Sequence, residues 1–305
     1  MASAPLADGV HVPDVESISI VVLTHNRRPL LQQCVENVLL RTSELTGEII
    51  IWDNASDDDS PQYLDQLEDP RLRIIHHPAN IGVNAYARAF RQATGDYLVE
   101  VDDDVIDAPP RWDETLVKAF EKVPHIGYLA ANLAHNPHDI TSGVMYGINA
   151  HMYRTEEVNG VRLKVGGPVG GWCSLTSREL HDRVGGWQEH KQAFWQEEAA
   201  FLDRLLSLGY GCACLEDLLV THASGPHYAR TPPAKLAYWR SYTRSASRKD
   251  AVKRSILRVP MVRSLNERHE WFHPPRERPD YLRLYSDVDA ARKQRDQEAG
   301  PLDFQ

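Results

Sequence analysis

Short apolar runs alternate with segments of helical periodicity through the first hundred residues. The runs at 18–23, 48–52 and 72–76 are rich in β-branched residues, which predicts buried strands. A fourth such run, 96–104, ends in acidic residues. The segments between these runs are predicted helices, at 30–42, 61–68 and 80–93. Strand, loop and helix therefore repeat four times, which predicts an α/β fold with a parallel, doubly wound sheet.

Polar residues follow each of the four predicted strands. The strands end at Thr24, Asp53, His76 and Asp102. Right-handed crossovers bring the carboxyl ends of parallel strands to one edge of the sheet, where open α/β sheets bind their ligands. The sequence therefore predicts a polar cleft at this edge.

The pattern changes in the second half of the chain. Asn159-Gly160 separates two alternating runs, which predicts a tight hairpin. Further strands are expected at 126–131 and 215–220, the latter ending at Thr221-His222. Helices are expected at 177–184, from 194 to 208, and in the basic region after residue 233.

Three consecutive carboxylates, Asp102-Asp103-Asp104, end the fourth strand. They repel one another, and a divalent cation with oxygen ligands is the simplest counter-charge. The alternative is a solvated acidic turn. Pro109 and Pro110 predict that the chain turns away here instead of extending the strand.

The composition is that of an ordinary globular protein of 305 residues, with 42% apolar and 25% charged residues. No apolar run is long enough to cross a bilayer. Residues 1–15 lack the basic start and apolar core of a secretory signal, and we expect a loose lead-in. The four cysteines are scattered without redox or zinc spacing, which indicates packing thiols and a cytoplasmic location.

Charge is distributed unevenly along the chain. The net charge of −9 argues against general binding to nucleic acid. Residues 230–263 nevertheless carry ten Lys and Arg against one acid. Arg240, Arg244 and Arg248 would share one helix face, which could contact an anionic membrane at its inner surface or an anionic acceptor. The alternative, a solvated helix or a contact in a homo-oligomer, is favoured by the acidic remainder of the chain.

Seven short motifs occur in an order typical of one family. They are Thr24-His25-Asn26-Arg27, Asp53-Asn54-Ala55-Ser56-Asp57, Asn80-Ile81-Gly82 with Arg88, Gly95-Asp96 leading to Asp102-Asp103-Asp104 with Pro109, Gly170-Gly171, Gly185-Gly186-Trp187, and Glu197-Glu198. Over residues 16–225 the chain resembles the nucleotide-sugar-dependent glycosyltransferases of family 2. The resemblance implies the GT-A fold, a Rossmann-like doubly wound mixed sheet with helices on both faces. It implies a nucleotide-binding half at 16–131 and an acceptor-binding half at 132–228. The composition of the remaining residues, 229–305, predicts a basic, mainly helical extension.

The resemblance also implies a donor-binding role for the first loops. Thr24, Asn26 and Arg27 would lie beside the nucleotide base, and Asp53 would accept a hydrogen bond from it; the alternative for Asp53 is a turn-forming side chain. Asn80 belongs to the same set. Two further positions are implied in donor binding: Arg88 would lie near the donor phosphates, unless it is an ordinary surface arginine, and Asp102 or Asp103 would hold the ribose or a metal-bound water.

A metal site follows from the same resemblance. Asp104 matches the family's metal ligand, with Asp102 beside it, and Mn²⁺ or Mg²⁺ fits oxygen ligands. His222 matches a position that often completes the site, and an imidazole ligand favours Mn²⁺. The alternative for His222 is a hydrogen-bonded core histidine, with His227 as the second candidate ligand.

Glu197-Glu198 stands where the family carries an acidic pair, usually Glu-Asp. Its second member is the catalytic base, which would here be Glu198, one methylene longer than the usual Asp. The alternative is a pair of acids stabilised at a helix N-terminus. Trp172 and Trp195 flank these positions and would stack on the acceptor, although large aromatics also occupy cores.

The expected function is therefore transfer of a sugar, with inversion, from a nucleoside-diphosphate sugar. UDP is the default nucleotide, with dTDP and GDP open. The acceptor would be a sugar, a lipid-linked molecule or a small molecule. A phosphatase that uses Asp102–Asp104, a sugar nucleotidyltransferase and a non-catalytic sugar-nucleotide-binding protein are the rival interpretations. A phosphatase motif would normally follow the first strand of its domain, and the nucleotidyltransferase's glycine-rich loop is absent after the first strand.

Overall fold

The computed structural model describes residues 17–229, 233–256, 258–259, 261–262 and 265. The expected lead-in at 1–15 and most of the extension beyond residue 256 lie outside the described residues. The strands are β1 Ile18–Thr24, β2 Thr46–Asp53, β3 Leu72–His76, β4 Tyr97–Asp102, β5 Val105–Asp107, β6 Ile126–Leu133, β7 Arg154–Val158, β8 Val161–Val165, β9 Cys173–Ser177 and β10 Gly211–His222. The helices are α1 Arg28–Arg41, α2 Ser60–Leu64, α3 Asn84–Phe90, α4 Trp112–Lys122, α5 Ile140–Gly143, the π-helix η1 Val144–Ile148, the 3₁₀-helix η2 Ala150–Met152, α6 Arg178–Arg183, α7 Glu197–Ser207 and α8 Pro233–Ile256.

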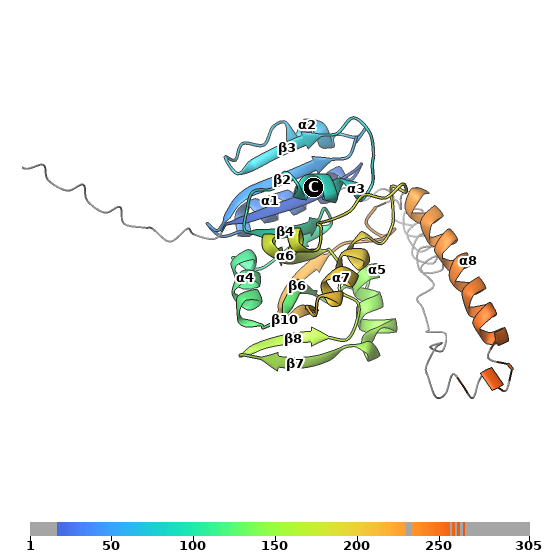
Figure 1. Cartoon of the computed structure of the whole chain (residues 1–305). Coiled ribbons are helices and arrows are strands. Elements are labelled where there is room, and N and C mark those ends of the chain that lie inside the picture. Colours follow the sequence, from blue (N-terminus) through green and yellow to red (C-terminus); the bar gives the residue numbers. More distant parts are fainter. Residues whose placement is uncertain (1–16, 230–232, 257, 260, 263–264, 266–305) are drawn as a thin grey trace, which may run out of the picture.

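The strands form one mixed sheet in the order β3-β2-β1-β4-β9-β6-β10-β8-β7, with β5 paired to β10 (Figure 1). β3, β2, β1 and β4 run parallel, as the repeated strand–helix pattern predicts. β9 runs antiparallel between β4 and β6, while β6 and β10 are parallel to one another. The mixed α/β fold expected from the resemblance is confirmed.

The central strands are covered on both faces. Five consecutive residues of β1, from Ile18 to Val22, are fully buried, so side chains that point to opposite faces are equally shielded. α3 packs against β1 and β2, α6 against β9, and α7 against β10. One continuous hydrophobic core runs through the sheet from β3 to β10.

After the acidic triplet the chain turns away instead of extending β4, as expected. It then forms the short strand β5, which was not predicted; β5 pairs antiparallel with the end of β10 and places His222 opposite Val105. α4 was not predicted, and β10 begins four residues earlier than expected. The Asn159-Gly160 hairpin is confirmed: both residues have positive φ, and β7 and β8 pair across them.

α8 stands beside the body of the molecule instead of in its sheet layers (Figure 1). Leu236 and Trp239 pack against Ile140 of α5 and Val144 of η1. Within the described residues, none of the helices combines the length and the apolar character that crossing a bilayer requires.

Candidate functional site

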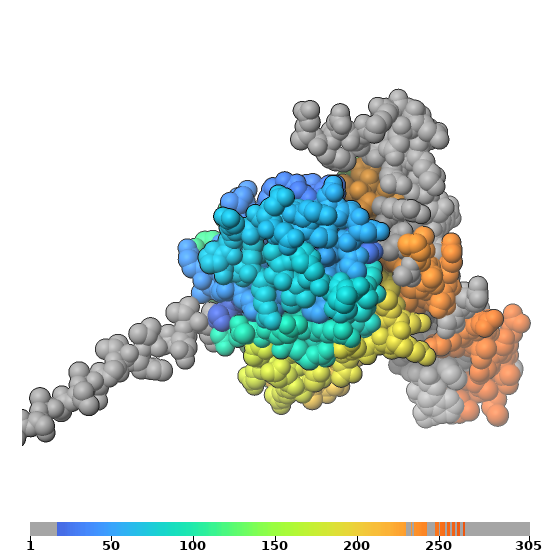
Figure 2. Space-filling view, turned by 90° about the horizontal axis from the view of Figure 1, so that it is seen from above, coloured from blue at the N-terminus to red at the C-terminus, as the bar shows by residue number. Residues whose placement is uncertain are grey.

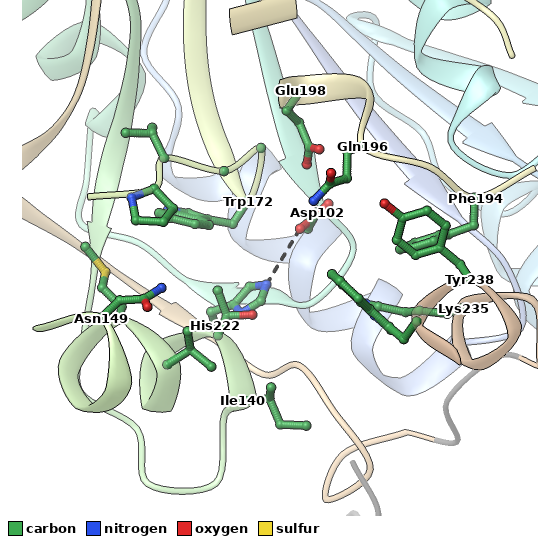
Figure 3. A pocket seen from close by; sticks show the side chains of 18 of the residues that line it. Asp102, Ile140, Asn149, Trp172, Phe194, Gln196, Glu198, His222, Lys235 and Tyr238 are labelled. Carbon is green, nitrogen blue, oxygen red and sulfur yellow. Dashed lines mark ion pairs between the residues drawn. The ribbon is translucent and has the colours of Figure 1, made fainter. Parts of the chain in front are cut away.

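Two adjoining cavities lie at the carboxyl edge of the sheet. One, of about 400 Å³, is lined by the ends of β1 and β2 and by α3. The other, of about 270 Å³, is lined by α5, the 168–172 loop, His222 and α8 (Figure 3). Among the described residues, the wall that the two cavities share consists of Asp102, Phe194, Trp195, Glu198 and Lys235.

The middle carboxylate of the acidic triplet, Asp103, lines the larger cavity and is engaged by the first loop. Thr24 Oγ1 donates a hydrogen bond to Asp103 Oδ2 at 2.8 Å, and the Arg27 guanidinium pairs with Asp103 at 2.5 Å. Burial raises the pKa of Asp103 to about 6, although the Arg27 charge acts in the opposite direction. Thr24 and Arg27, expected beside the base, thus also tie the triplet to the first loop.

The last carboxylate of the triplet is brought to His222. Arg27 pairs with Asp104 Oδ2 at 2.8 Å, and Asp104 Oδ1 lies 2.9 Å from His222 Nε2. Asp102 Oδ2 is 3.7 Å from the same nitrogen. The register of β10 against β5 produces this approach, and it is reinforced because the Ala223 N–H donates to the Asp104 carbonyl.

His222 is held in one orientation by Asp139, a residue that the sequence analysis did not identify. His222 Nδ1 lies 3.0 Å from Asp139 Oδ1, and Asp139 also accepts hydrogen bonds from the Ser224 backbone and hydroxyl. This arrangement leaves His222 Nε2 directed at Asp102 and Asp104. His227, the second candidate, stacks on His138 at 4.2 Å and is not part of the group.

Asp102, Asp104 and His222 fit a divalent cation. Their ligand atoms lie within 4.8 Å of one another. His222 Nε2 and Asp104 Oδ1 are buried and neither makes a hydrogen bond, despite their short separation. Two close, unsatisfied ligand atoms that face the same point are what a shared cation requires.

The electrostatics of the group also favours a positive charge. Burial acts to lower the pKa of His222, but the charge of Asp104, the nearby Asp102 carboxylate and the bond to Asp139 outweigh it and raise that pKa well above its usual range. Burial acts to raise the pKa of Asp104, but His222 and Arg27 hold it well below its ordinary value. A proton on Nε2 or a bound cation would each satisfy this environment.

The other predicted donor-site residues are only partly brought together. Asn80 lines the larger cavity, beside Asn54 and His25. The Asp53 carboxylate instead accepts from the Ser56 backbone N–H at 3.0 Å and lies 3.0 Å from His76 Nδ1, so it forms the turn considered as its alternative. Asn26 bonds Asp57 in the adjoining loop. Arg88 pairs with Glu189 on the surface, at 2.9 Å, and does not line either cavity.

Glu198 lies on the shared wall, as expected, beside Asp102. Burial and the Asp102 charge raise the pKa of Glu198. Glu197 is buried with Oε2 unpaired, and burial together with Glu198 raises its pKa well above the usual range. Both are close to Glu100, a buried acid of β4 whose Oε2 is also unpaired.

The tryptophans occupy different environments. Trp195 lines both cavities, and its indole N–H donates to Asn84 at 3.2 Å. Trp172 lines the smaller cavity but is largely buried, with its N–H donating to the Ala131 carbonyl. α8 adds Tyr238 and Trp239 to the same cavity.

Three residues of the site were missed by the sequence analysis: Asp139, Glu100 and Lys235. Glu100 had a signal, because an acid within the apolar run before the triplet is unusual for a buried strand. Asp139 and Lys235 are far from the motifs in sequence, and only the fold brings them to the edge.

The fold and the site together define an α/β protein that binds its ligand across the carboxyl edge of a mixed sheet, beside an acidic, cation-compatible group. The chain belongs to glycosyl transferase family 2, whose family model matches residues 19–185. It is 26% identical over 263 residues to the O-antigen biosynthesis protein RfbC of Myxococcus xanthus, covering 78% of this chain and 20% of that protein. The chain spans less than half the length of the curated relatives that it matches.

Solved structures confirm the GT-A fold. The crystal structure of S. aureus TarS 1–349 matches 93% of this chain and 72% of that chain, with a TM-score of 0.51 and 13% identity. The crystal structure of GalNAc-T7 with UDP, GalNAc and Mn²⁺ matches 69% of this chain and 44% of that chain, with a TM-score of 0.51 and 15% identity.

Proposed function

We propose that this chain transfers a sugar from a nucleoside-diphosphate sugar to an acceptor hydroxyl, with inversion at the anomeric carbon. The observation that carries the proposal is the shared wall: Asp102 and Glu198 lie between a polar cavity beside β1 and β2 and an aromatic cavity that reaches His222. A ligand with a nucleoside at one end and a sugar at the other fits across this wall.

The larger cavity is the nucleoside site in this proposal. Thr24, His25, Asn54 and Asn80 line it. His25 Nδ1 is buried without a hydrogen-bond partner and is the group best placed to bind base or ribose, whereas Thr24 bonds Asp103 and Asn54 bonds the loop at 80–82. UDP is the nucleotide that we propose, supported by the family resemblance and by the UDP in the GalNAc-T7 structure. Asp53 and Arg88 are poorer candidates than the sequence implied, because their side chains are engaged elsewhere.

Asp102, Asp104 and His222 would hold Mn²⁺ or Mg²⁺, with Asp139 fixing the imidazole. When bound, the cation stabilises negative charge on the leaving diphosphate. The imidazole nitrogen favours Mn²⁺, the ion present in the GalNAc-T7 structure.

Glu198 is the proposed general base, with Glu197 behind it. Its raised pKa makes it a stronger base than an exposed glutamate, and it faces the smaller cavity, where the acceptor would bind. Trp195 and Trp172 would provide apolar surfaces for the acceptor sugar.

The purified chain should be incubated with UDP-, dTDP- and GDP-sugars, Mn²⁺ or Mg²⁺, and a set of sugar and lipid-linked acceptors. Release of the nucleoside diphosphate, lost in EDTA and in Asp104→Asn, would support the proposal. Release of inorganic phosphate would instead indicate a phosphatase, and binding without turnover would indicate a binding protein. Full activity in EDTA would refute the metal site.

A further inference from the structure

The first turn of α8 is anchored against the body of the molecule, although it lies outside the segment matched by the family model. Leu236 and Trp239 pack on α5 and η1. Tyr238 meets Phe194 edge-on at 5.2 Å. Figure 2 shows the described part of α8 lying beside the main body. These three anchoring residues directly follow Lys235 in the helix, and they therefore set its position.

Lys235 lies where the two cavities join. Among the described residues that line both cavities, it is the one basic side chain. Its Nζ lies 5.5 Å from the centre of the Phe194 ring, and its charge acts on Asp104, Glu197 and Glu198. Figure 3 shows it extending from α8 on the same side as Tyr238 and Phe194, across from Glu198.

A molecule that occupies both cavities must cross this junction. In a nucleotide sugar the group between nucleoside and sugar is the diphosphate. The junction therefore needs positive charge that is matched to phosphate oxygens.

The acidic triplet cannot provide that charge. Its three carboxylates stand against one guanidinium, Arg27, which leaves two negative charges. One divalent cation would balance these and leave the diphosphate itself without a protein counter-charge. A lysine on the opposite wall supplies it.

We propose that Lys235 binds the donor diphosphate and stabilises it as the leaving group. This inference rests on the function proposed above. As the acceptor oxygen forms its bond to the anomeric carbon, the bond from that carbon to the phosphate oxygen breaks and its electron pair stays on the diphosphate. The acceptor proton goes to Glu198, while the Lys235 ammonium donates hydrogen bonds to phosphate oxygens and keeps its own protons.

The test compares diphosphates with monophosphates. UDP, dTDP and GDP, each with its monophosphate, are titrated by calorimetry in Mn²⁺ into the wild-type chain and into Lys235→Met. The nucleoside diphosphate that the wild type binds most tightly is then compared between the two proteins. We expect its affinity for the variant to be roughly ten- to a hundredfold lower, which is the effect of losing one hydrogen bond to a charged group. Monophosphate affinity should change by less than about twofold, because the proposed contact is with the second phosphate, which a monophosphate lacks.

Two further variants separate this role from a structural one. Lys235→Arg keeps the charge and should restore most of the diphosphate preference. Lys249→Met removes an exposed lysine of the same helix, away from both cavities, and should change nothing. If Lys235→Met weakens the binding of the diphosphate and of the monophosphate equally, or weakens the binding of neither, Lys235 does not bind the diphosphate. This conclusion would hold even if the wild type transfers sugar. If no diphosphate binds the wild type, the proposed function falls, and this inference with it.

Discussion

The three carboxylates of the acidic triplet have different partners. Asp103 accepts a hydrogen bond from Thr24 and pairs with Arg27, which ties the turn after β4 to the first loop. Asp102 and Asp104 both approach His222 Nε2, at 3.7 and 2.9 Å. Asp103 and Asp104 form the turn between β4 and β5, and this turn brings Asp102 and Asp104 to the same nitrogen.

Replacing Glu198 with Gln tests the base directly. The amide keeps the size of the side chain but cannot accept the acceptor proton, so kcat for transfer should fall by roughly 10²–10⁴. Calorimetric affinity for the nucleoside diphosphate should stay within about twofold. Glu179→Gln, on the exposed side of α6, is the control and should keep full activity. Unchanged turnover in the Glu198 variant would remove it from this role.

Replacing Asp139 with Asn tests how His222 is oriented. Asn replaces the charged partner of Nδ1 with a neutral amide, and Mn²⁺ affinity measured by calorimetry should fall by about 10- to 100-fold.

Asp139 also caps α5: its Oδ2 accepts from the Ser142 N–H while its Oδ1 accepts from the Ser224 N–H. The amide of Asn has one acceptor oxygen, so the replacement leaves one of these N–H groups facing a donor and lowers stability as well. Ser177→Ala removes the equivalent cap of α6, away from the cavities, at a cost of about 1 kcal/mol. That control should lose stability with Mn²⁺ affinity intact. Equal Mn²⁺ binding in both variants would show that Asp139 does not support a metal ligand.

At the scale of single residues, the sequence predicted Asp102, Asp104, His222 and Glu198. The structure places Asp102, His222 and Glu198 on the walls of the adjoining cavities and Asp104 against His222. Asp53 and Arg88 were expected at the donor, but local partners engage their side chains. The sequence shows which polar groups follow a strand, but it does not show which neighbouring residue each side chain will bond.

At the scale of elements, the segment that carries Phe194 and Trp195 is fastened to the start of α3. The Val83 N–H donates to the Ala193 carbonyl at 2.8 Å. Gly82 has a φ of +62°, and a Cβ there would lie 1.6 Å from the same carbonyl oxygen. Only glycine allows this close approach.

Gly82→Ala should therefore unfold more easily and bind nucleoside diphosphate at least tenfold more weakly, because Phe194 and Trp195 would be displaced. Gly160→Ala is the matched control: its φ is also positive, at +75°, but its surroundings are open. It should cost only about 1 kcal/mol, from backbone strain. Thermal unfolding and calorimetry measure both effects. Equal losses of stability and of nucleotide affinity in the two variants would show that the contact with Ala193 is unimportant.

The first four strands and their order of appearance followed from periodicity, but the sheet's centre did not. β9 enters antiparallel between β4 and β6, and nothing in Cys173–Ser177 indicates its direction. Its direction matters, because the loop before β9 reaches the cavity edge and places Trp172 there. α4 did carry a helical period in Trp112, Leu116 and Ala119, all buried, and could have been predicted.

At the scale of the whole molecule, one buried histidine should couple stability to pH. His181 packs on Trp187, its Nε2 accepts from the Trp187 N–H, and its Nδ1 bonds Asp182. Burial lowers its pKa; Asp182 opposes this, and Arg178 and Arg204 add to it. His181 is therefore protonated at a lower pH in the folded chain than in the unfolded chain. The stabilisation is present above the unfolded pKa of about 6.5 and is lost as pH falls through it towards the folded value.

Melting temperatures of the wild type and His181→Gln should be compared between pH 7.5 and 5.5. The wild type should lose more stability than the variant over this interval, so that the difference between them narrows as pH falls. Comparing the two proteins cancels the opposite effect of His222, whose pKa is raised. A difference independent of pH would show that His181 titrates alike in the folded and unfolded chain.

Charge is segregated across the chain, with the basic segment in and after α8 and the acidic groups in the body. Arg240 and Arg248 are exposed, which fits either a solvated helix or a contact surface. Contact with an anionic membrane and homo-oligomer formation stay predictions from the sequence.

The helix that completes both cavities is encoded downstream of the portion shared with the family. The same downstream portion carries Glu198 and His222, the proposed base and a proposed metal ligand. Recombination that exchanged it would therefore replace these residues together with Lys235, and laboratory chimeras of related enzymes would keep the three matched to one another only when the junction falls before Glu197.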